Sequence, residues 1–208
     1  MFAKTEVIPM IRKFSCVKEC SDCCMYREYY PSVEYGKIGV LIMPEERSRV
    51  IDIAARNGIR INIMPRLGIG RNVKGDGPKK IIAYQMMGKN LNGNCCPFLE
   101  TDASQRSPHG GLICKIYAQR PLACVSYPVI EENRKSVLLD GKCTFCHKLS
   151  TTIVEKNGLQ QEIEALNKIK SEVSVDEKIE IWRYATAVGD EENAAKFFPP
   201  GWVLQGSG

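Results

Sequence analysis

The amino-acid sequence predicts an α+β fold: a small, loop-rich domain organised by cysteine and metal, with a helical hairpin at the C-terminal end. Three observations predict it. The 208 residues are 44% apolar and 25% charged, the composition of a chain that buries a core without cross-links. Helical and strand-like patterns both occur, and all ten cysteines precede residue 150. We therefore expect a cysteine-cluster, metal-chelating domain over residues 1–150 and a helical extension over residues 151–208 that packs on it.

A helix is predicted over residues 44–57. Pro44 suits a first helical turn, and Gly58 suits the position just after a helix ends. Three apolar residues at helical spacing would face the core: Val50, Ile53 and Ala54.

Strands are predicted on either side of a glycine-rich loop at residues 66–78. Residues 59–63 alternate apolar with polar side chains, and residues 80–86 are short and β-prone. In the C-terminal part, apolar residues recur at helical spacing from Leu159 to Ile169. A second helix is expected to begin at Ser174, with Glu177 completing a capping box, so that two helices cover residues 159–189.

The sequence favours a cytoplasmic location. The first residues lack an apolar segment followed by a small-residue cleavage site, so no secretory signal is predicted. Residues 38–43 form an apolar stretch far short of the roughly 20 residues that span a membrane, so no membrane span is expected. A reducing cytosol keeps thiols free, and clustered cysteines are then better explained as metal ligands than as disulfides.

Four cysteines lie within one short segment near the N-terminus: Cys16, Cys20, Cys23 and Cys24. Thiolates are the ligands that zinc and iron–sulfur clusters prefer, whereas a segment this rich in charge is a poor setting for buried apolar thiols. Adjacent side chains of an extended segment point to opposite faces. Either Cys23 and Cys24 therefore serve different centres, or one of them is not a ligand.

The other six cysteines lie in a second region of turns and short elements, at Cys95, Cys96, Cys114, Cys124, Cys143 and Cys146. The same alternatives apply to the adjacent Cys95 and Cys96. Pro97 stiffens the turn after them. Cys143 and Cys146 form a CxxC pair, which occurs in metal sites and in redox pairs. No thioredoxin-like βαβ pattern surrounds this pair, so we favour a metal site.

Taken in order, the motifs CxxxCxxCC, CPFL, CxIYxxRPxxC followed by SYP, and a late cysteine resemble the YkgJ-like CxxCxxCC cysteine-cluster family. Its members are described as carrying a putative zinc- or iron-chelating domain, and the flagellin lysine N-methylases are distantly similar. The resemblance spans about residues 14–150. This chain has CSDCC where the family usually has CGxCC, and Val125 where the family has an arginine.

The resemblance implies a ligand set. It marks Cys16, Cys20, Cys23, Cys24, Cys96, Cys114 and Cys124, together with Cys143 or Cys146. These eight positions suit two four-cysteine centres, or one centre with additional thiols. Arg120 matches the family's RP pair and would donate hydrogen bonds near the thiolates; an arginine at the start of a surface helix is the alternative.

The predicted cofactor is an iron–sulfur cluster, with [4Fe-4S] favoured and zinc as the alternative. The chain has two histidines, His109 and His147, so the ligand set is almost purely sulfur. Its cysteines do not form the two neat CxxC pairs of a zinc knuckle, and Cys96 followed by Pro97 is similar to cluster-binding turns. His147 is expected to be a neighbour of the site and not a ligand.

Two functions stay open. The first is a metal-binding protein whose cluster supports the fold, redox chemistry, assembly or recognition of a protein partner. The second is an iron–sulfur-dependent enzyme resembling a protein-lysine N-methyltransferase, although the sequence has no GxGxxG fingerprint. Nucleic acid is not an expected partner, because the basic residues between Arg66 and Lys80 come without a nucleic-acid-binding motif.

Overall fold

The computed structural model describes most of the chain. The described residues are 13–25, 31–32, 36–37, 39–88, 95–102, 104–107, 110–176, 178–185 and 201–205. The helices and strands are, in chain order, α1 (Asp22–Met25), β1 (Pro31–Ser32), β2 (Gly36–Lys37), β3 (Val40–Ile42), α2 (Pro44–Arg56), β4 (Ile63–Ile69), β5 (Lys80–Met86), β6 (Leu99–Glu100), β7 (Ile113–Cys114), η1 (Tyr117–Gln119), α3 (Leu122–Val125), β8 (Val129–Glu132), β9 (Ser136–Leu139), α4 (Thr144–Leu149), β10 (Ile153–Glu155), α5 (Gln160–Val173), β11 (Ile181–Ala185) and β12 (Gly201–Leu204).

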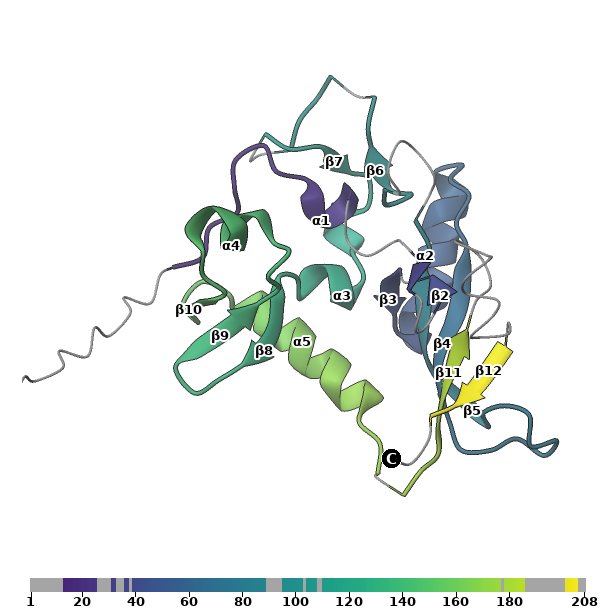
Figure 1. Cartoon of the computed structure of the whole chain (residues 1–208). Helices are drawn as coiled ribbons and strands as arrows, with labels where there is room; N and C mark the ends of the chain where they lie inside the picture. The colour runs from purple at the N-terminus through teal and green to yellow at the C-terminus, as the bar shows by residue number, and fades with distance from the viewer. Residues whose placement is uncertain are drawn as a thin grey trace, which may run out of the picture.

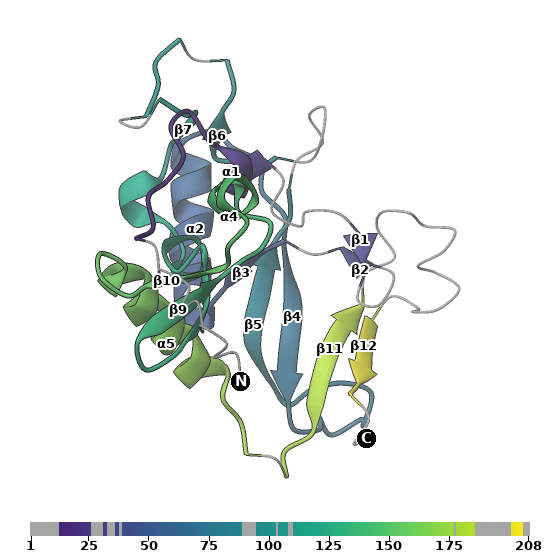
Figure 2. The same ribbon diagram turned by 60° about the vertical axis from the view of Figure 1, so that its left-hand side comes forward.

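The largest sheet has five antiparallel strands in the order β12-β11-β4-β5-β3. Figure 2 shows α2 and α5 on the same side of this sheet, and both helices contact β5. The α+β class predicted from the sequence is therefore confirmed. The apolar cluster between the sheet and the helices, here the main core, consists of Val40, Ile42, Met43, Val50, Ile53, Ala54, Ala83, Met86, Cys95, Cys96, Phe98, Leu99, Ile116, Ala123 and Ile169.

A second, three-stranded sheet has the order β10-β9-β8 and lies beside α4 and α5 (Figure 1). A separate apolar cluster, here the second core, consists of Val129, Val137, Leu139, Phe145, Cys146, Val154, Leu159 and Leu166. The long helix α5 connects the two parts, because it contacts α3 and β8 as well as β5.

The helix predicted over residues 44–57 is confirmed as α2. Pro44 opens the helix, Asn57 is its C-cap, and Gly58 follows with φ +64°, a left-handed conformation that glycine adopts without a Cβ clash. Val50, Ile53 and Ala54 are buried, as their spacing predicts.

The strand prediction is right for residues 80–86, which are β5, and wrong at the neighbouring strand. Residues 59–62 precede β4, which begins at Ile63, opposite Met86 at the end of β5. Residues 66–69, predicted to be loop, continue β4 through two register irregularities. Gly68 allows this, since a Cβ there would lie 2.4 Å from Pro78 Cγ.

The first C-terminal helix is confirmed as α5, but the second is wrong. Ser174 is the C-cap of α5, Glu177 lies outside the described residues, and the chain continues into strand β11. Strand pairing decides the outcome, because β11 pairs with both β4 and β12, and Tyr184 stacks edge-on against Trp202 opposite it. Residues 151–208 therefore do not form a purely helical extension, and they supply strands to both sheets.

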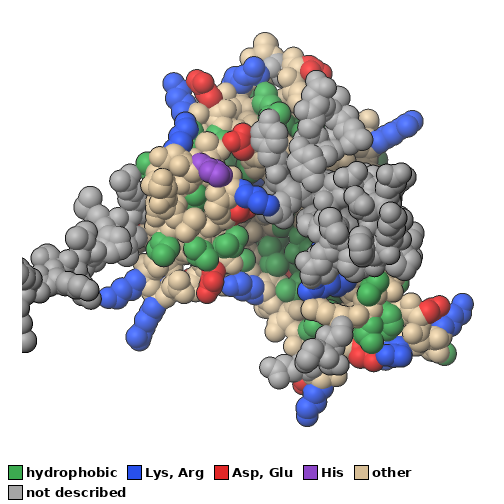
Figure 3. Space-filling view, in the orientation of Figure 1, with side chains coloured by type: hydrophobic (Ala, Val, Ile, Leu, Met, Phe, Trp, Pro, Cys, Tyr) green, Lys and Arg blue, Asp and Glu red, His purple; other side chains and the backbone are tan. Residues whose placement is uncertain are grey.

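No helix among the described residues is long and apolar enough to cross a membrane. On the face drawn in Figure 3, Lys and Arg side chains are scattered among acidic and neutral ones and do not gather in one patch. Of the basic residues on the β4–β5 loop, Arg71 forms a two-pronged ion pair with Glu180, at 2.6 and 3.0 Å.

Candidate metal centre

The N-terminal cysteines lie on a tight turn that leads into the short helix α1. Cys20 N donates to Val17 O at 3.1 Å, and Glu19 between them has φ +64°, a conformation that few residues other than glycine adopt. Cys23 and Cys24 follow on one helical turn, with their Sγ atoms 3.9 Å apart. The two side chains are thus neighbours, because the segment is helical and not extended as the sequence argument assumed.

Helix α1 lies between the elements that carry the other cysteines. Figures 1 and 2 both place it next to α4 and to the β6–β7 pair. Cys96 N donates to Cys24 O at 2.7 Å, and Leu112 N donates to Ser21 Oγ at 2.7 Å. These bonds join the N-terminal turn to chain segments more than 70 residues away.

Two glycines allow the segment before β7 to approach this turn. A Cβ on Gly111 would lie 2.4 Å from Cys20 O and 2.7 Å from Ser21 Oγ. Gly110, with φ +89°, lies against Glu19 in the same way. The close contact therefore depends on the absence of side chains at both positions.

Thr144 connects the same turn to α4. Cys20 Sγ donates to Thr144 Oγ1 at 3.3 Å, and the Thr144 hydroxyl donates to Asp22 Oδ2. Cys143 is the N-cap of α4, adjacent to Thr144, and Cys146 lies one turn along the helix. Cys143 is therefore brought to the N-terminal turn, whereas Cys146 is buried in the second core.

Cys96, Cys114 and Cys124 come from three further segments of the chain. Cys96 lies at the start of a turn that leads into β6, and Cys114 pairs with Leu99 across the β6–β7 ladder. Cys124 lies on α3, a helix of one turn, where its N–H donates to Pro121 O.

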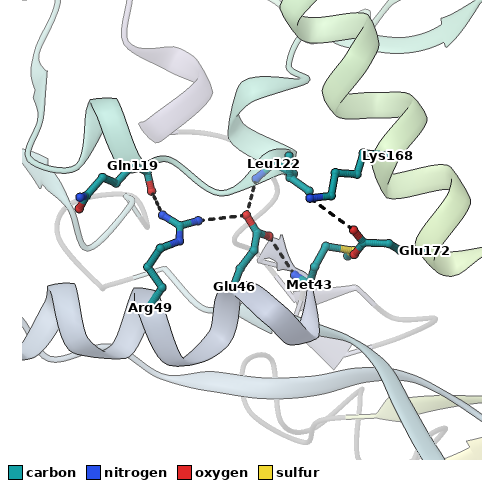
Figure 4. Close-up of polar contacts among 7 residues, drawn as sticks. All are labelled: Met43, Glu46, Arg49, Gln119, Leu122, Lys168 and Glu172. Atoms are coloured by element: carbon teal, nitrogen blue, oxygen red, sulfur yellow. Dashed lines mark hydrogen bonds and ion pairs between the residues drawn. The ribbon is translucent and has the colours of Figure 1, made fainter.

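A buried glutamate on α2 fixes the start of α3. Glu46, 8% exposed, accepts hydrogen bonds from Leu122 N at 2.8 Å and from Met43 N at 3.0 Å, and it pairs with Arg49 at 3.3 Å (Figure 4). Arg49 also donates to Gln119 O. This cluster ties the segment before Cys124 to the main core.

The thiols on the α4 side repel one another when ionised. The pKa of Cys16 is raised by burial first, and then by the negative charges of Cys20, Cys23 and Cys143. Burial also raises the pKa of Cys143, with further contributions from Cys20 and Cys23, while the backbone amides of Phe145 and Cys146 oppose the shift. The four thiols are close enough to interact electrostatically.

A second set of interactions surrounds Cys24. The pKa of Cys24 is raised above its usual range by the hydrogen bond with Cys23, then by burial and by the charges of Cys23, Cys96 and Cys124. The pKa of Cys114 is raised by burial and by Cys23, although the Arg120 guanidinium lowers it. A cation among these thiolates would relieve the repulsion within both sets.

Arg120 is close enough to Cys114 to act on it electrostatically. Its guanidinium carbon lies 3.9 Å from the ring centroid of Tyr117, a cation–π contact, and its charge acts on Cys114. Its Nε is buried and has no hydrogen-bond partner among the described residues. An acceptor beside Cys114 would satisfy this donor.

The remaining predicted residues lie at the border of the group or outside it. The pKa of Cys146 is raised to about 11 by burial first, and Cys143 is the one thiol whose charge contributes to that shift. Cys95 is buried in the main core, and His147 is exposed. His109 lies outside the described residues.

Sequence reasoning missed the residues that hold the cysteines in place: Asp22, Glu46, Gly111 and Thr144. Asp22 and Thr144 directly neighbour cysteines of the motifs, which is a weak sequence signal for a role at the site. No sequence signal marks Glu46, because its partner Leu122 is 76 residues away.

Across the part of the chain that the structure describes, no three histidine, cysteine, aspartate or glutamate side chains form a group that could hold a metal ion as they stand. Ligation would require the cysteine side chains to turn toward a common point.

Comparisons of the chain with protein-family models, with curated proteins and with solved structures found no match. The resemblance to the YkgJ-like family therefore stays a prediction from the motifs.

Proposed function

We propose that this chain is a metal-binding protein whose clustered cysteines chelate iron, as an iron–sulfur cluster, or zinc. One observation carries the proposal. Five separate segments bring eight cysteines around α1, at Cys16, Cys20, Cys23, Cys24, Cys96, Cys114, Cys124 and Cys143.

A structural role for buried thiols explains this arrangement less well. Cys16 and Cys23 are exposed, and a thiol in solvent contributes little to a core. Burial and mutual repulsion disfavour ionisation of these thiols. A bound cation would stabilise the thiolates and offset this cost.

The donor set fits a soft metal. Thiolates select zinc and iron–sulfur clusters, and the unpartnered Nε of Arg120 beside Cys114 fits the sulfur acceptors of such a centre. The Sγ atoms of Cys23 and Cys24, 3.9 Å apart, are close to the ~3.8 Å edge of a tetrahedron with ~2.3 Å zinc–sulfur bonds. When bound, the metal would cross-link the N-terminal turn to α3, α4 and the β6–β7 pair, and a cluster would also supply a one-electron redox centre.

Iron–sulfur remains the favoured centre on the sequence motifs. Zinc remains the alternative, because it accepts the same all-thiolate ligand set. The methyltransferase-like enzyme rests on the motif resemblance and stays a prediction. Transfer of label from S-adenosylmethionine to a protein in cell extract would support that alternative.

The test is to purify the full chain without oxygen, record its absorption spectrum, and measure iron, zinc and sulfide per chain. A brown protein with iron and sulfide in equal amounts supports the cluster. A colourless, zinc-loaded protein overturns the choice of iron. A folded, metal-free protein whose ten thiols all react in denaturant, and whose exposed thiols react freely before unfolding, overturns metal binding altogether.

A matched pair of variants makes the test specific. Cys124→Ala removes a thiol of the group around α1, whereas Cys95→Ala removes a buried thiol of the main core that the proposal leaves out. We expect Cys124→Ala to lower the metal content and Cys95→Ala to retain it. Equal metal content in both variants would contradict the ligand set.

A further inference from the structure

Cys23 and Cys24 are adjacent in the sequence, and their sulfur atoms are also in contact. Both residues lie on α1, a single helical turn, with their Sγ atoms 3.9 Å apart. Cys24 N and Met25 N both donate to Ser21 O, at 2.9 and 3.1 Å, and close the turn. Cys96 N donates to Cys24 O at 2.7 Å and joins the turn to a distant segment. The fold therefore brings the two thiols together before any ligand binds, which lowers the entropy cost of binding both.

The pair is open to solvent on one side. Cys23 is exposed, whereas Cys24 is half-buried and packs against the main core. One thiol is thus anchored, and the other can be reached by a small molecule. The chain has a second adjacent pair, Cys95 and Cys96, but these residues are only 2% and 6% exposed. The two pairs share a sequence pattern and differ in access.

Two thiols in contact suit a ligand that forms two bonds to sulfur. Zinc and iron–sulfur centres take about four protein ligands. No three ligand-type side chains among the described residues form a group that could hold a metal ion as they stand. A trivalent arsenic atom that carries one organic group has two bonds left to form, and it is a soft partner of the kind that thiolates prefer. Bonds from thiolate to a soft ion are ~2.3 Å long, so two of them span up to ~4.6 Å, which covers the 3.9 Å between the sulfur atoms.

A disulfide between Cys23 and Cys24 fits the turn less well. Adjacent Cα atoms are ~3.8 Å apart across a trans peptide, which is shorter than the lower limit of ~4.4 Å that is usual for disulfides. Closing this bond would require the backbone to move, and the hydrogen bonds of Cys24 with Ser21 and Cys96 oppose that movement. A single atom that bridges the two sulfur atoms requires only that the side chains rotate.

We propose that Cys23 and Cys24 form an accessible dithiol site for trivalent arsenicals, which bind through both sulfur atoms. An arsenical of the form R–As(OH)2 forms two arsenic–sulfur bonds and loses two arsenic–oxygen bonds. The two hydroxyl groups leave as water with the two thiol protons, and arsenic stays trivalent, so no oxidant or reductant is needed. The inference goes beyond the proposed iron or zinc binding and does not depend on it, because this site consists of two thiols without a metal.

The protonation of the pair is compatible with this reaction. The pKa of Cys24 is raised by its hydrogen bond with Cys23, and then by burial. Because the overall reaction consumes protonated thiols, this shift does not oppose it.

The test uses the reduced, metal-free full chain and phenylarsine oxide, a trivalent arsenical with one organic group. After excess reagent is removed, mass spectrometry counts the bound phenylarsenic groups, and a thiol assay counts the thiols that remain. We expect about one group per chain and a loss of about two thiols. Peptide mapping should place the group on Cys23 and Cys24. A chain that binds no group, or whose Cys95–Cys96 pair reacts as readily, overturns the proposal.

Displacement of the group shows whether both sulfur atoms hold it. The dithiol 2,3-dimercaptopropanol should remove the group at least about tenfold faster than 2-mercaptoethanol at equal thiol concentration. The reason is that a monothiol breaks one bond and leaves the arsenic tethered beside the freed sulfur. Equal rates of removal would contradict binding through two thiols.

Variants assign the site to the pair. Cys23→Ala removes the exposed member of the pair and should lose the bound group. Cys16→Ala is the matched control: its thiol is also exposed, but Cys16 Sγ donates to Val17 O and should not be needed. Binding by Cys23→Ala equal to that of the parent, or equal losses in both variants, would overturn the assignment.

The result can be separated from that of the proposed function. Iron, zinc and sulfide are measured on the chain as purified, whereas the arsenical is added after metal has been removed. A chain that binds phenylarsine oxide at this pair but neither iron nor zinc overturns the proposed function and supports the dithiol site. A chain that binds metal but no arsenical does the reverse.

Discussion

Arg120 is the residue whose role depends most directly on the metal. Its guanidinium lies over the exposed ring of Tyr117, and its charge acts on the Cys114 thiol. Its Nε is buried and has no hydrogen-bond partner among the described residues. The interpretation of Arg120 as a support for thiolates stays a prediction from the sequence.

Replacing Arg120 with methionine should weaken the proposed metal binding, because the thiolates lose a cation and a donor. We expect a chelator to remove metal from the loaded Arg120→Met chain about 10–100-fold faster than from the parent, with Arg120→Lys intermediate. If the centre is an iron–sulfur cluster, its reduction potential should fall in the methionine variant, since a nearby positive charge favours the reduced form. Unchanged release and potential in both variants would contradict the role.

Gly111 tests whether the contact between the N-terminal turn and the segment before β7 is needed. Gly111→Ala would place a Cβ 2.4 Å from Cys20 O, and both atoms belong to backbone segments that are difficult to move. We expect a loss of about 1–3 kcal/mol in the free energy of unfolding, together with a loss of bound metal. Chemical denaturation and metal analysis measure the two effects.

Gly141→Ala is the matched control for that variant. A Cβ there would meet Thr152 Cγ2 at 3.8 Å, an ordinary contact. Its stability should change by no more than about 0.5 kcal/mol. If Gly111→Ala and Gly141→Ala change the free energy of unfolding and the metal content equally, the close approach at Gly111 is not needed for either property.

At the scale of elements, α2 positions α3 through Glu46. The carboxylate is buried and accepts from the first N–H of α3, at Leu122, as well as from Met43 at its own helix start. A short helix has little stability of its own, so α3 depends on this contact to hold Cys124 in place.

Glu46→Ala should lower the free energy of unfolding by about 2 kcal/mol, because hydrogen bonds to a charged acceptor are lost and buried donors remain. The variant should also bind less metal. Asp52→Ala, an exposed acidic position on α2, is the control and should leave both properties nearly unchanged. A Glu46→Ala protein as stable as the control would contradict the anchoring role.

Helices α2 and α5 also present acidic groups to each other. The pKa of Glu172 is raised by burial first, and then by the charge and hydrogen bond of Glu45 and the charge of Glu46, while Lys168 at 3.9 Å opposes the shift (Figure 4). A carboxyl group whose pKa is raised on folding contributes stability below its unfolded pKa of about 4.3, and that stability is lost as the pH rises through the folded value.

Glu172→Gln should therefore gain melting temperature relative to the parent as the pH is raised from about 4 to 7, because the glutamine does not ionise. Glu164→Gln, at an exposed position of the same helix, is the control and should show a smaller dependence. A difference between Glu172→Gln and the parent that is constant with pH would contradict the prediction.

At the scale of the molecule, the cysteines lie where the two apolar cores meet the N-terminal turn. The main core and the second core each have their own sheet, and α5 contacts elements of both. Metal at α1 would add a cross-link between the turn, α3, α4 and β6–β7. It would leave the β4–β5 hairpin and α2 untouched, because they carry no cysteine.

Metal removal should accordingly loosen one part of the molecule. Hydrogen exchange of the metal-loaded and chelator-treated full chain should show faster exchange at residues 13–25, 95–102 and 143–149, with β4, β5 and α2 still protected. The melting temperature should fall, since metal that binds the folded state alone stabilises it. A uniform increase in exchange would indicate that the whole fold depends on the metal, and an absence of change would contradict the cross-link.

The sequence was sufficient where the signal is local. Pro44, Gly58 and the apolar spacing between them define α2, and the spacing from Leu159 to Ile169 defines α5. The cysteine motifs likewise predict a shared ligand group from residue type and spacing, and that function remains a proposal.

Tertiary structure decided whatever depends on distant partners. Residues 181–185 became a strand and not a helix because β4 and β12 pair with them, and residues 66–69 continue β4 because Lys80 and Ile81 lie opposite. Packing likewise gave the adjacent Cys23 and Cys24 different exposure, since Cys24 lies against the main core and Cys23 is exposed, while their Sγ atoms stay 3.9 Å apart. Sequence motifs can identify candidate thiols, but the burial of each thiol results from contacts between segments 70 or more residues apart.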